Sequence, residues 1–230
     1  MSYLWQEFNI KTFSAETLVF RDGVFIPELS DYKNIEISEN NINIKESSIL
    51  PIHIIYIGEI AGNFDININI YAENTKIFMT NKTIAKKPAF LNIFVKNYGE
   101  NSVFDGQIII QNHKNLKIDV KGEHFSKNTG ILIKTKVMAY ENSDTELNGY
   151  AIINKDLKDC DSNISFSVMA DKNTKIKLKP TQYIKSIPLN ATHSASLYNP
   201  NQNQINYLSE SGLSSNEIQE LLKEAFLSQE

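Results

Sequence analysis

Apolar and polar residues alternate with period two through the middle of the chain, a pattern that sends successive side chains to opposite faces of a β-strand. Polar pairs such as Glu73-Asn74 and Glu100-Asn101 separate the alternating runs and predict turns. No helical periodicity interrupts the stretch from about 34 to about 187, so helices cannot connect parallel strands there. The pattern predicts an all-β core, and it leaves an antiparallel sandwich and a β-solenoid equally open. The clearest alternating runs are 34–37, 41–44, 64–70, 116–120 and 175–178.

The end of the chain follows a different pattern, which predicts one short α-helix after a polar loop. Ser214 is suited to be the helix N-cap, and Glu217 three residues later completes a capping box. The apolar residues that follow share one face of the predicted helix. We expect this helix to fold back over the open end of the β-core and to protect its strand edges. The face consists of Ile218, Leu221, Leu222 and Ala225, with Phe226 beside it.

Composition narrows the class of protein without identifying its chemistry. The 230 residues carry a formal charge of −4 and no basic stripe, so we expect no nucleic-acid partner. No apolar run approaches the ~20 residues that a membrane span requires, and the first residues lack the pattern of a signal peptide. The single cysteine excludes an internal disulfide framework. These features predict a cytoplasmic protein with no membrane partner.

The C-terminal segment contains a series of short motifs in a fixed order: Pro180 and Ile184, Thr192 to Ser196, Tyr207-Leu208, Gly212 to Ser214, and Leu221-Leu222 with Ala225-Phe226. With these motifs it resembles the SufB/SufD family of iron–sulfur cluster assembly scaffolds. The likeness extends to the lead-in from Thr17 to Ser30, which is similar to that of SufD-type members. The resemblance implies a right-handed parallel β-helix, which decides between the two architectures. We therefore divide the chain into a lead-in (1–33), a β-helix core (34–187) and a C-terminal turn and helix (188–230).

The same resemblance singles out two candidate ligands for a transient iron–sulfur cluster. Cys160, followed by Asp161 and Ser162, resembles the step where SufB-type members hold a cluster-forming cysteine. His193 matches the family's Ser/Thr-His turn, which the resemblance implies lies at the SufB–SufD interface. Thiolate sulfur and imidazole nitrogen both bind iron, but two ligands are too few for a cluster in one chain. The alternative reading makes Cys160 a small buried hydrophobic residue and His193 a plain turn or interface residue.

The family resemblance also suggests partners. The last strands, about 175–187, leave an unpaired edge that a second copy or a SufB-type subunit would extend. Leu221, Leu222 and Phe226 are candidate partner-binding residues, because the family's C-terminal helices dock the SufC-type ATPase; here we expect the docking segment to be truncated. Ser194 stands where SufB-type members have Glu and SufD-type members have Gly, and a second cysteine for sulfur entry is missing. The chain is thus expected to be a SufD-like accessory subunit rather than an enzyme.

Two alternatives belong to other functional classes. One is a structural interaction module that has kept the fold and binds no cluster. The other is a carbohydrate-active β-helix enzyme, for which Asp119 and Glu123 would form the carboxylate pair. The remaining histidines, His53, His113 and His124, show no metal-ligand spacing and are assigned structural or surface roles.

Overall fold

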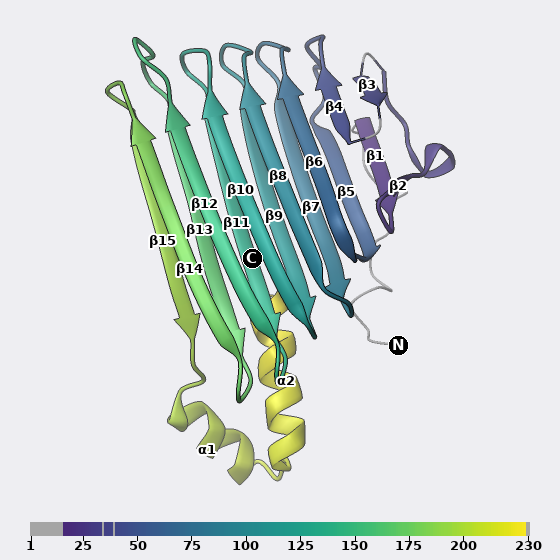
Figure 1. Ribbon diagram of the computed structural model, residues 1–230, viewed down its shortest axis with the longest axis vertical. Coiled ribbons are helices and arrows are strands. Elements are labelled where there is room, and N and C mark those ends of the chain that lie inside the picture. The colour runs from purple at the N-terminus through teal and green to yellow at the C-terminus, as the bar shows by residue number, and fades with distance from the viewer. Residues whose placement is uncertain (1–15, 34, 39, 229–230) are drawn as a thin grey trace.

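The computed structural model describes residues 16–33, 35–38 and 40–228 of the protein, and these form two stacked β-sheets with two helices beside them (Figure 1). Sheet A contains, in spatial order, β15 (Asn190–Tyr198), β13 (Asp161–Ala170), β11 (Gly130–Ala139), β9 (Val103–Asn112), β7 (Lys76–Ala85), β5 (Ile52–Glu59), β1 (Glu16–Arg21) and β2 (Val24–Phe25). Sheet B contains β14 (Lys175–Ile184), β12 (Asp144–Ile153), β10 (Asn115–His124), β8 (Ala89–Asn97), β6 (Gly62–Ile70), β4 (Asn41–Ile44) and β3 (Ile35–Ser38).

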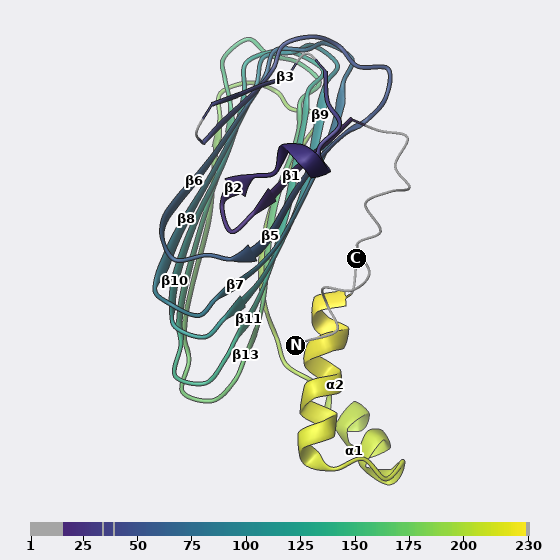
Figure 2. The same ribbon diagram turned by 90° about the vertical axis from the view of Figure 1, so that its right-hand side faces the viewer.

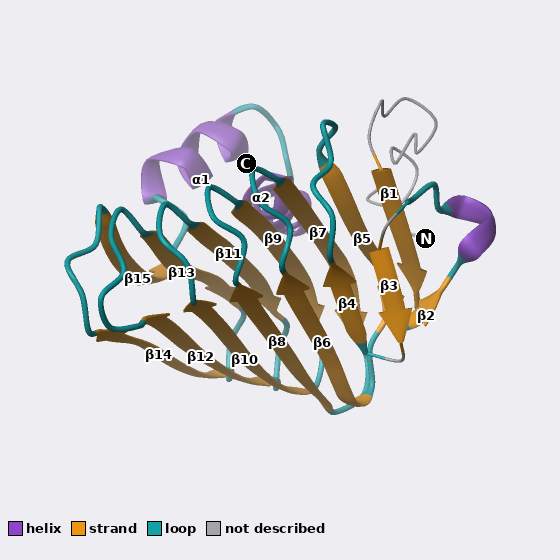
Figure 3. Ribbon diagram, turned by 90° about the horizontal axis from the view of Figure 1, so that it is seen from above, coloured by secondary structure: helices purple, strands orange, loops and turns teal. Residues whose placement is uncertain are grey.

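The chain winds between the two sheets as a parallel β-solenoid, which confirms the predicted β-helix. From β4 to β15 successive strands alternate between sheet B and sheet A, and each pairs in parallel with the strand two places along (Figure 3). The alternating runs predicted from the sequence lie in β3, β4, β6, β10 and β14, except for residue 34 of the first run, which lies outside the described residues. Strands also reach beyond the expected core, because β1 lies within 1–33 and β15 within 188–230.

The core lies between the sheets and consists of the inward half of each alternating pattern. Ile68, Ile93 and Ile118 from sheet B are completely buried, as are Ile54 and Ile133 from sheet A. Neighbouring strands hold these residues in register, with Ile68 opposite Val95 and Ile93 opposite Val120. Stacked β-branched side chains therefore fill the interior turn after turn, and each buried isoleucine contributes about 1.5–3 kcal/mol of transfer free energy.

The corners between strands are formed by asparagines in the left-handed conformation. Asn74, Asn101 and Asn128 have φ values of 53°, 59° and 55°. Asn101 donates from Nδ2 to Oδ1 of Asn74 over 3.1 Å, so that equivalent corners of adjacent turns are bonded to each other. Asparagine tolerates this conformation better than other residues with a side chain, because its amide bonds locally. The polar pairs Glu73-Asn74 and Glu100-Asn101 correctly predicted the first two of these corners, whereas the corner at Asn128 was not predicted.

The two ends of the solenoid differ. At the N-terminal end β1 pairs with β2 and β3 with β4 in antiparallel hairpins, which close the stack around the first turns. At the C-terminal end β15 and β14 are the last strands of sheets A and B, and no other described strand pairs with their outer edges. The C-terminal end of the solenoid is therefore open.

The helices lie beside the solenoid and leave its open end uncovered (Figure 2). Helix α1 (Gln202–Glu210) was not predicted; Asn201 caps it, with Gln204 completing a capping box. Helix α2 (Ser215–Ser228) begins as predicted, with Ser214 and Glu217 bonded reciprocally. The expectation that it covers the strand edges was wrong.

Helix α2 packs on the outer face of sheet A, and three side chains of the sheet explain this position. Ile109, Met138 and Met169 project outward and form one apolar cluster with the helix. Lys223, only 7% exposed, reaches Asp171 over 3.0 Å and lies 4.9 Å from the ring centre of Tyr140. Burying three outward apolar side chains and pairing one lysine outweighs what the helix would gain at the strand edges.

The asparagine corners generate a testable prediction. Replacing Asn101 with alanine removes the hydrogen bond to Asn74. Alanine also lacks the side-chain amide that helps asparagine to adopt the left-handed conformation, so the free energy of unfolding should fall by about 1 kcal/mol. Asn101→Gly is the matched control, because glycine adopts this conformation without strain and should cost less than the alanine variant. Urea denaturation of both variants measures the difference; equal losses would show that backbone conformation does not select the residue here.

Candidate functional site

The open end of the solenoid exposes the inner face of its last turn. On β14 the inward residues include Ile176 and Leu178, which pack on the core only from the side of the previous turn. On β15 the inward residue Leu197 is 51% exposed. The connection between the two strands adds Ile187 and Leu189, which are 87% and 71% exposed. With the exception of Gln182 on β14 and the histidine described next, this end therefore presents an apolar layer that nothing among the described residues covers.

His193 is the imidazole of this layer. It lies within strand β15 opposite Ile164, a core residue of β13 that is 1% exposed, so its side chain points to the same inner side. Its ring is solvent-exposed, because no further turn follows. The expected turn at this motif is instead a regular strand. The side chains alternate as in any strand: Ala191, His193 and Ala195 point inward, and serine and threonine point outward. Because these side chains are small, the hydrophobic contrast that usually reveals a strand in a sequence is weak here.

Cys160 lies one turn further in, at a corner of the solenoid. It is completely buried and precedes β13, at the corner position that Ser102 and Thr129 occupy before β9 and β11. Its Sγ lies 3.4 Å from the carbonyl oxygen of Ser126 and 3.5 Å from Oγ1 of Thr129. The thiol thus occupies a position that small hydroxyl side chains fill in earlier turns. Its surroundings are polar rather than the apolar core expected for a buried cysteine.

His124 shares this corner with Cys160. The sequence alone predicts only a structural or surface role for it. Its Nδ1 lies 2.7 Å from Oγ1 of Thr129, and its Nε2 is buried without a hydrogen-bond partner among the described residues. Burial lowers the pKa of His124 to about 4, so the ring is neutral in the folded protein. The repeat contains a signal that could have identified His124. Asn97 stands opposite it in β8 and donates a hydrogen bond to Ser102, the corner residue five positions later, as His124 contacts Thr129 five positions later.

The structure does not bring Cys160 and His193 together within one chain. His193 pairs with Ile164, four residues after Cys160, which separates the two positions by roughly 13 Å along the strands. The start of β15 lies next to Cys160, since the backbone N–H groups of Leu189 and Asn190 both donate to its carbonyl oxygen. No group of three or more His, Cys, Asp or Glu side chains in the described part of the chain is placed to hold a metal ion.

The three candidate partner-binding residues of α2 have different surroundings. Leu222 and Phe226 are 8% and 5% exposed and belong to the cluster on sheet A, whereas Leu221 is 44% exposed. Only Leu221 is therefore available to a partner while α2 stays docked. None of the described helices is long and apolar enough to cross a membrane.

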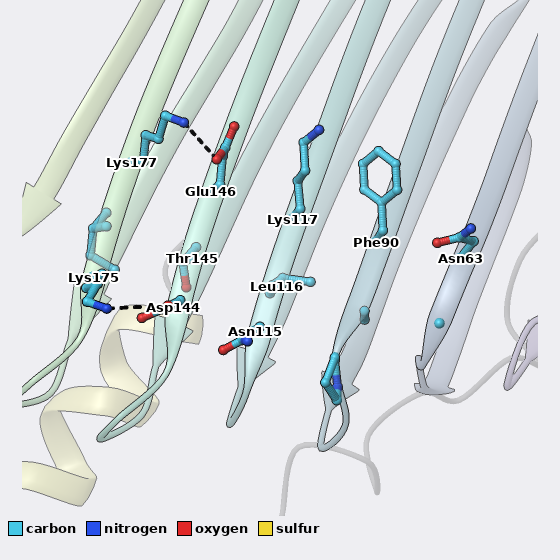
Figure 4. Close-up of a pocket in the computed structure, with 14 residues that line it drawn as sticks. Asn63, Phe90, Asn115, Leu116, Lys117, Asp144, Thr145, Glu146, Lys175 and Lys177 are labelled. Atoms are coloured by element: carbon cyan, nitrogen blue, oxygen red, sulfur yellow. Dashed lines mark hydrogen bonds and ion pairs between the residues drawn. The ribbon is translucent and has the colours of Figure 1, made fainter.

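The outer face of sheet B carries the two carboxylates of the carbohydrate-active alternative, and their spacing does not match that of a glycosidase pair. Asp119 and Glu123 both project outward from β10, but four residues separate them by roughly 13 Å, beyond the ~5–9.5 Å of glycosidase carboxylates. A shallow groove of about 560 Å³ runs across the starts of these strands (Figure 4). Four of its charged groups pair with each other, Lys175 with Asp144 and Lys177 with Glu146, the latter over 2.9 Å. The geometry gives the carbohydrate-active alternative no support.

Comparison with known proteins identifies one family. The model of the family described as "SUF system FeS cluster assembly, SufBD core domain" matches residues 61–226, from the start of β6 to the last turn of α2. A search of curated proteins gave no match. The family match covers the open end, His193 and the corner that contains Cys160.

The buried His124 predicts a loss of stability in acid. In the unfolded chain a histidine takes up its proton near pH 6.5, whereas in the folded protein it stays neutral down to about pH 4. The contribution of neutral His124 to the free energy of unfolding is therefore fully present above pH 6.5, and it is lost as the pH falls toward 4. Between pH 7 and pH 5 the free energy of unfolding should decrease by roughly 2 kcal/mol more in the wild type than in His124→Asn.

The asparagine variant is the matched control, because the preceding turn holds Asn97 at this position. Urea denaturation at both pH values isolates the contribution, since His53 and His113 are present in both proteins and their pKa values are also lowered by burial. Identical pH dependence of the two proteins would show that His124 titrates normally when folded.

Proposed function

Because the family model spans more than half of the chain, the protein belongs to the SufBD family and takes part in SUF iron–sulfur cluster assembly, and we propose that it acts there as a non-catalytic, SufD-like accessory scaffold. One observation carries the proposal: the open end of the solenoid presents His193 in an inner layer that is apolar apart from this ring and Gln182 of β14. In this scheme the cluster is cargo that the protein helps to hold and pass on. We assign this work to the cytoplasm, where thiols stay reduced.

The row of residues that contains His193 supports a specific role for its ring. Along sheet A the inward positions in register with it are Ile164 in β13 and Ile133 in β11, both fully within the core. An exposed imidazole in place of the next aliphatic side chain adds nothing to packing. It does supply a nitrogen ligand of the kind that iron accepts. His193 is accordingly the ligand that the proposed scaffold presents at its interface.

Cys160 is proposed as the second ligand, and its burial sets a condition. The thiolate is the form that binds iron, and it requires access to the open end. Residues 185–189 separate it from that end, held by the two hydrogen bonds to the Cys160 carbonyl and by a β-bridge between Lys158 and Ile187. Displacement of this segment when a partner binds would join the thiolate to the layer of His193. Further ligands would come from the partner, since one chain supplies only these two.

The partner at the open end is proposed to be a second copy or a SufB-type subunit. Both would cover the exposed Leu189 and Leu197 and extend the unpaired strands. A SufC-type ATPase is the proposed partner of the helices, with Leu221 as its contact.

A second candidate function is favoured by the corner that holds Cys160. The thiol fills a place that Ser102 and Thr129 fill in earlier turns, so packing alone accounts for it. A chain whose cysteine is purely structural would be an interaction module that keeps the SufBD fold and binds no cluster.

Anaerobic reconstitution with iron and sulfide separates the two functions. For a scaffold, the protein should develop visible cluster absorption that Cys160→Ser abolishes, because this removes the only thiolate, and that His193→Ala lowers several-fold. His53→Ala serves as the control, since His53 lies on the outer face of sheet A far from the open end. If the absorption arises only in a mixture with a SufB-type protein, the same substitutions are compared there. Absorption that neither substitution changes would leave the interaction module as the function.

A further inference from the structure

A second apolar patch lies on the outer face of sheet A, at the N-terminal end of the solenoid. Val19 of β1 and Ile55 of β5 are register partners, and they alternate with Leu18 and Ile54, which point into the core. Val19 and Ile55 therefore project outward. The two residues are nevertheless only 0% and 2% exposed, and they belong neither to the core nor to the cluster beneath α2. Something other than α2 covers this patch.

Burial along one outward row shows where the cover lies. The row runs from Val19 and Ile55 across β7 and β9 to Lys134 of β11. Its residues are buried on β1 and β5, half-buried on β7 and β9, and exposed on β11. A bare sheet would show the opposite trend, because side chains near its edge have fewer neighbours. Thr17, which also projects outward from β1, is 5% exposed. The cover is therefore centred on the N-terminal end of this face.

The described residues next to β1 do not provide this cover. The segment after β2 bonds to the backbone of Val19 through Ile26 and Ser30, and thus lies along the edge of the strand. None of the residues in its 3₁₀ turn, Pro27–Leu29, is buried, and Leu29 is 38% exposed. A second molecule is not required either, because the patch is buried within a single chain. The cover must come from another part of the same chain.

Only one part of the chain outside the described residues is long enough to serve. These parts are residues 1–15, 34, 39 and 229–230, and the first of them directly precedes β1. Fifteen residues span up to roughly 50 Å when extended. The distance across the sheet from β1 to β9 is only about 14 Å, or three strand spacings. The segment has one Glu and one Lys, hence no net charge, and several large apolar side chains. These are Leu4, Trp5, Phe8, Ile10 and Phe13.

We propose that residues 1–15 pack against the outer face of sheet A over Val19 and Ile55, with Trp5 among the side chains buried there. Half-buried Ile57 of β5 stands in the same outward row as Ile109, which belongs to the cluster beneath α2. The segment and α2 then cover neighbouring parts of one face, so that segments from both ends of the chain hold sheet A. These contacts lie within one chain and are independent of the proposed function.

The first test uses the fluorescence of Trp5, which is the single tryptophan of the chain and reports on this segment alone. In the wild type, acrylamide should quench it several-fold less efficiently than in the urea-unfolded chain. Ile55→Glu places a charge in the patch and should raise the quenching constant close to the unfolded value. Lys134→Glu is the matched control, because it introduces the same side chain at the exposed end of the same row, and it should leave quenching unchanged. Circular dichroism confirms that both variants are folded.

The second test changes the segment and leaves the sheet intact, so it remains decisive if Ile55→Glu does not fold. Phe8→Ser removes an apolar contact and should raise the quenching of Trp5, whereas Lys11→Ser should not. His53 gives an independent readout, because it projects outward from β5 two residues before Ile55 and burial lowers its pKa. In the Phe8→Ser variant its titration, followed by NMR, should move toward pH 6.5.

Three results would overturn the proposal. Quenching of Trp5 that is equal in the native and unfolded wild type shows that the segment does not dock. Equal effects of Ile55→Glu and Lys134→Glu show that it docks away from this patch. A His53 whose pKa stays lowered while Phe8→Ser exposes Trp5 shows that side chains of the sheet, and not the segment, bury this part of β5.

Discussion

Every strand of this solenoid depends on its neighbours in the previous and next turns for its backbone hydrogen bonds. A strand such as β9 has both neighbours, and its polar groups are satisfied on either side. A parallel solenoid cannot close on itself as a barrel does, so it has edge strands at both of its ends. At the N-terminal end antiparallel hairpins satisfy the last edges. At the C-terminal end no other described strand pairs with the outer edges of β14 and β15, and this is why we propose an interface there.

The corners show why a cysteine is weaker evidence of function than the histidine. Before β9, β11 and β13 the chain needs a small side chain that bonds to a neighbouring carbonyl, and Ser102, Thr129 and Cys160 all meet this need. The thiol is therefore explained by its position in the fold. His193 replaces an aliphatic residue in an apolar row, and the structure gives its ring no hydrogen bond to any other described residue. A residue that the fold does not require is the better candidate for chemistry.

A strand could be predicted from the sequence where its inward and outward residues differ strongly in hydrophobicity. Strands rich in isoleucine, such as β6, were found because their inward residues are large and their outward residues polar. The repeat itself escaped notice because its length varies: Ile52 pairs with Ile77 and Gly130 with Asp161, which are 25 and 31 residues apart. Strand β15 was taken for a turn because alanine and serine alternate almost without contrast in hydrophobicity.

The position of α2 was missed for a different reason, although the sequence contains a signal. Met138 and Met169 each follow an inward valine directly, so two apolar residues stand side by side where the alternation requires one. Such doublets mark strands that are covered on both faces. Recognising them would have predicted a helix on the outer face of sheet A. Nothing in the sequence alone, however, showed that Cys160 lies at a corner beside His124, because that contact joins residues 36 positions apart through Thr129.

Strand geometry links the free edge to the imidazole. On both terminal strands the residues whose backbone faces the open edge are also those whose side chains point inward, because both directions alternate with the same period. On β15 these residues include His193. A partner strand that bonds to the free N–H of His193 therefore also adds the next row to the inner layer and covers its ring. Edge pairing and enclosure of the candidate ligand are for this reason one event, and a scaffold built in this way gains its shielded site only when it assembles.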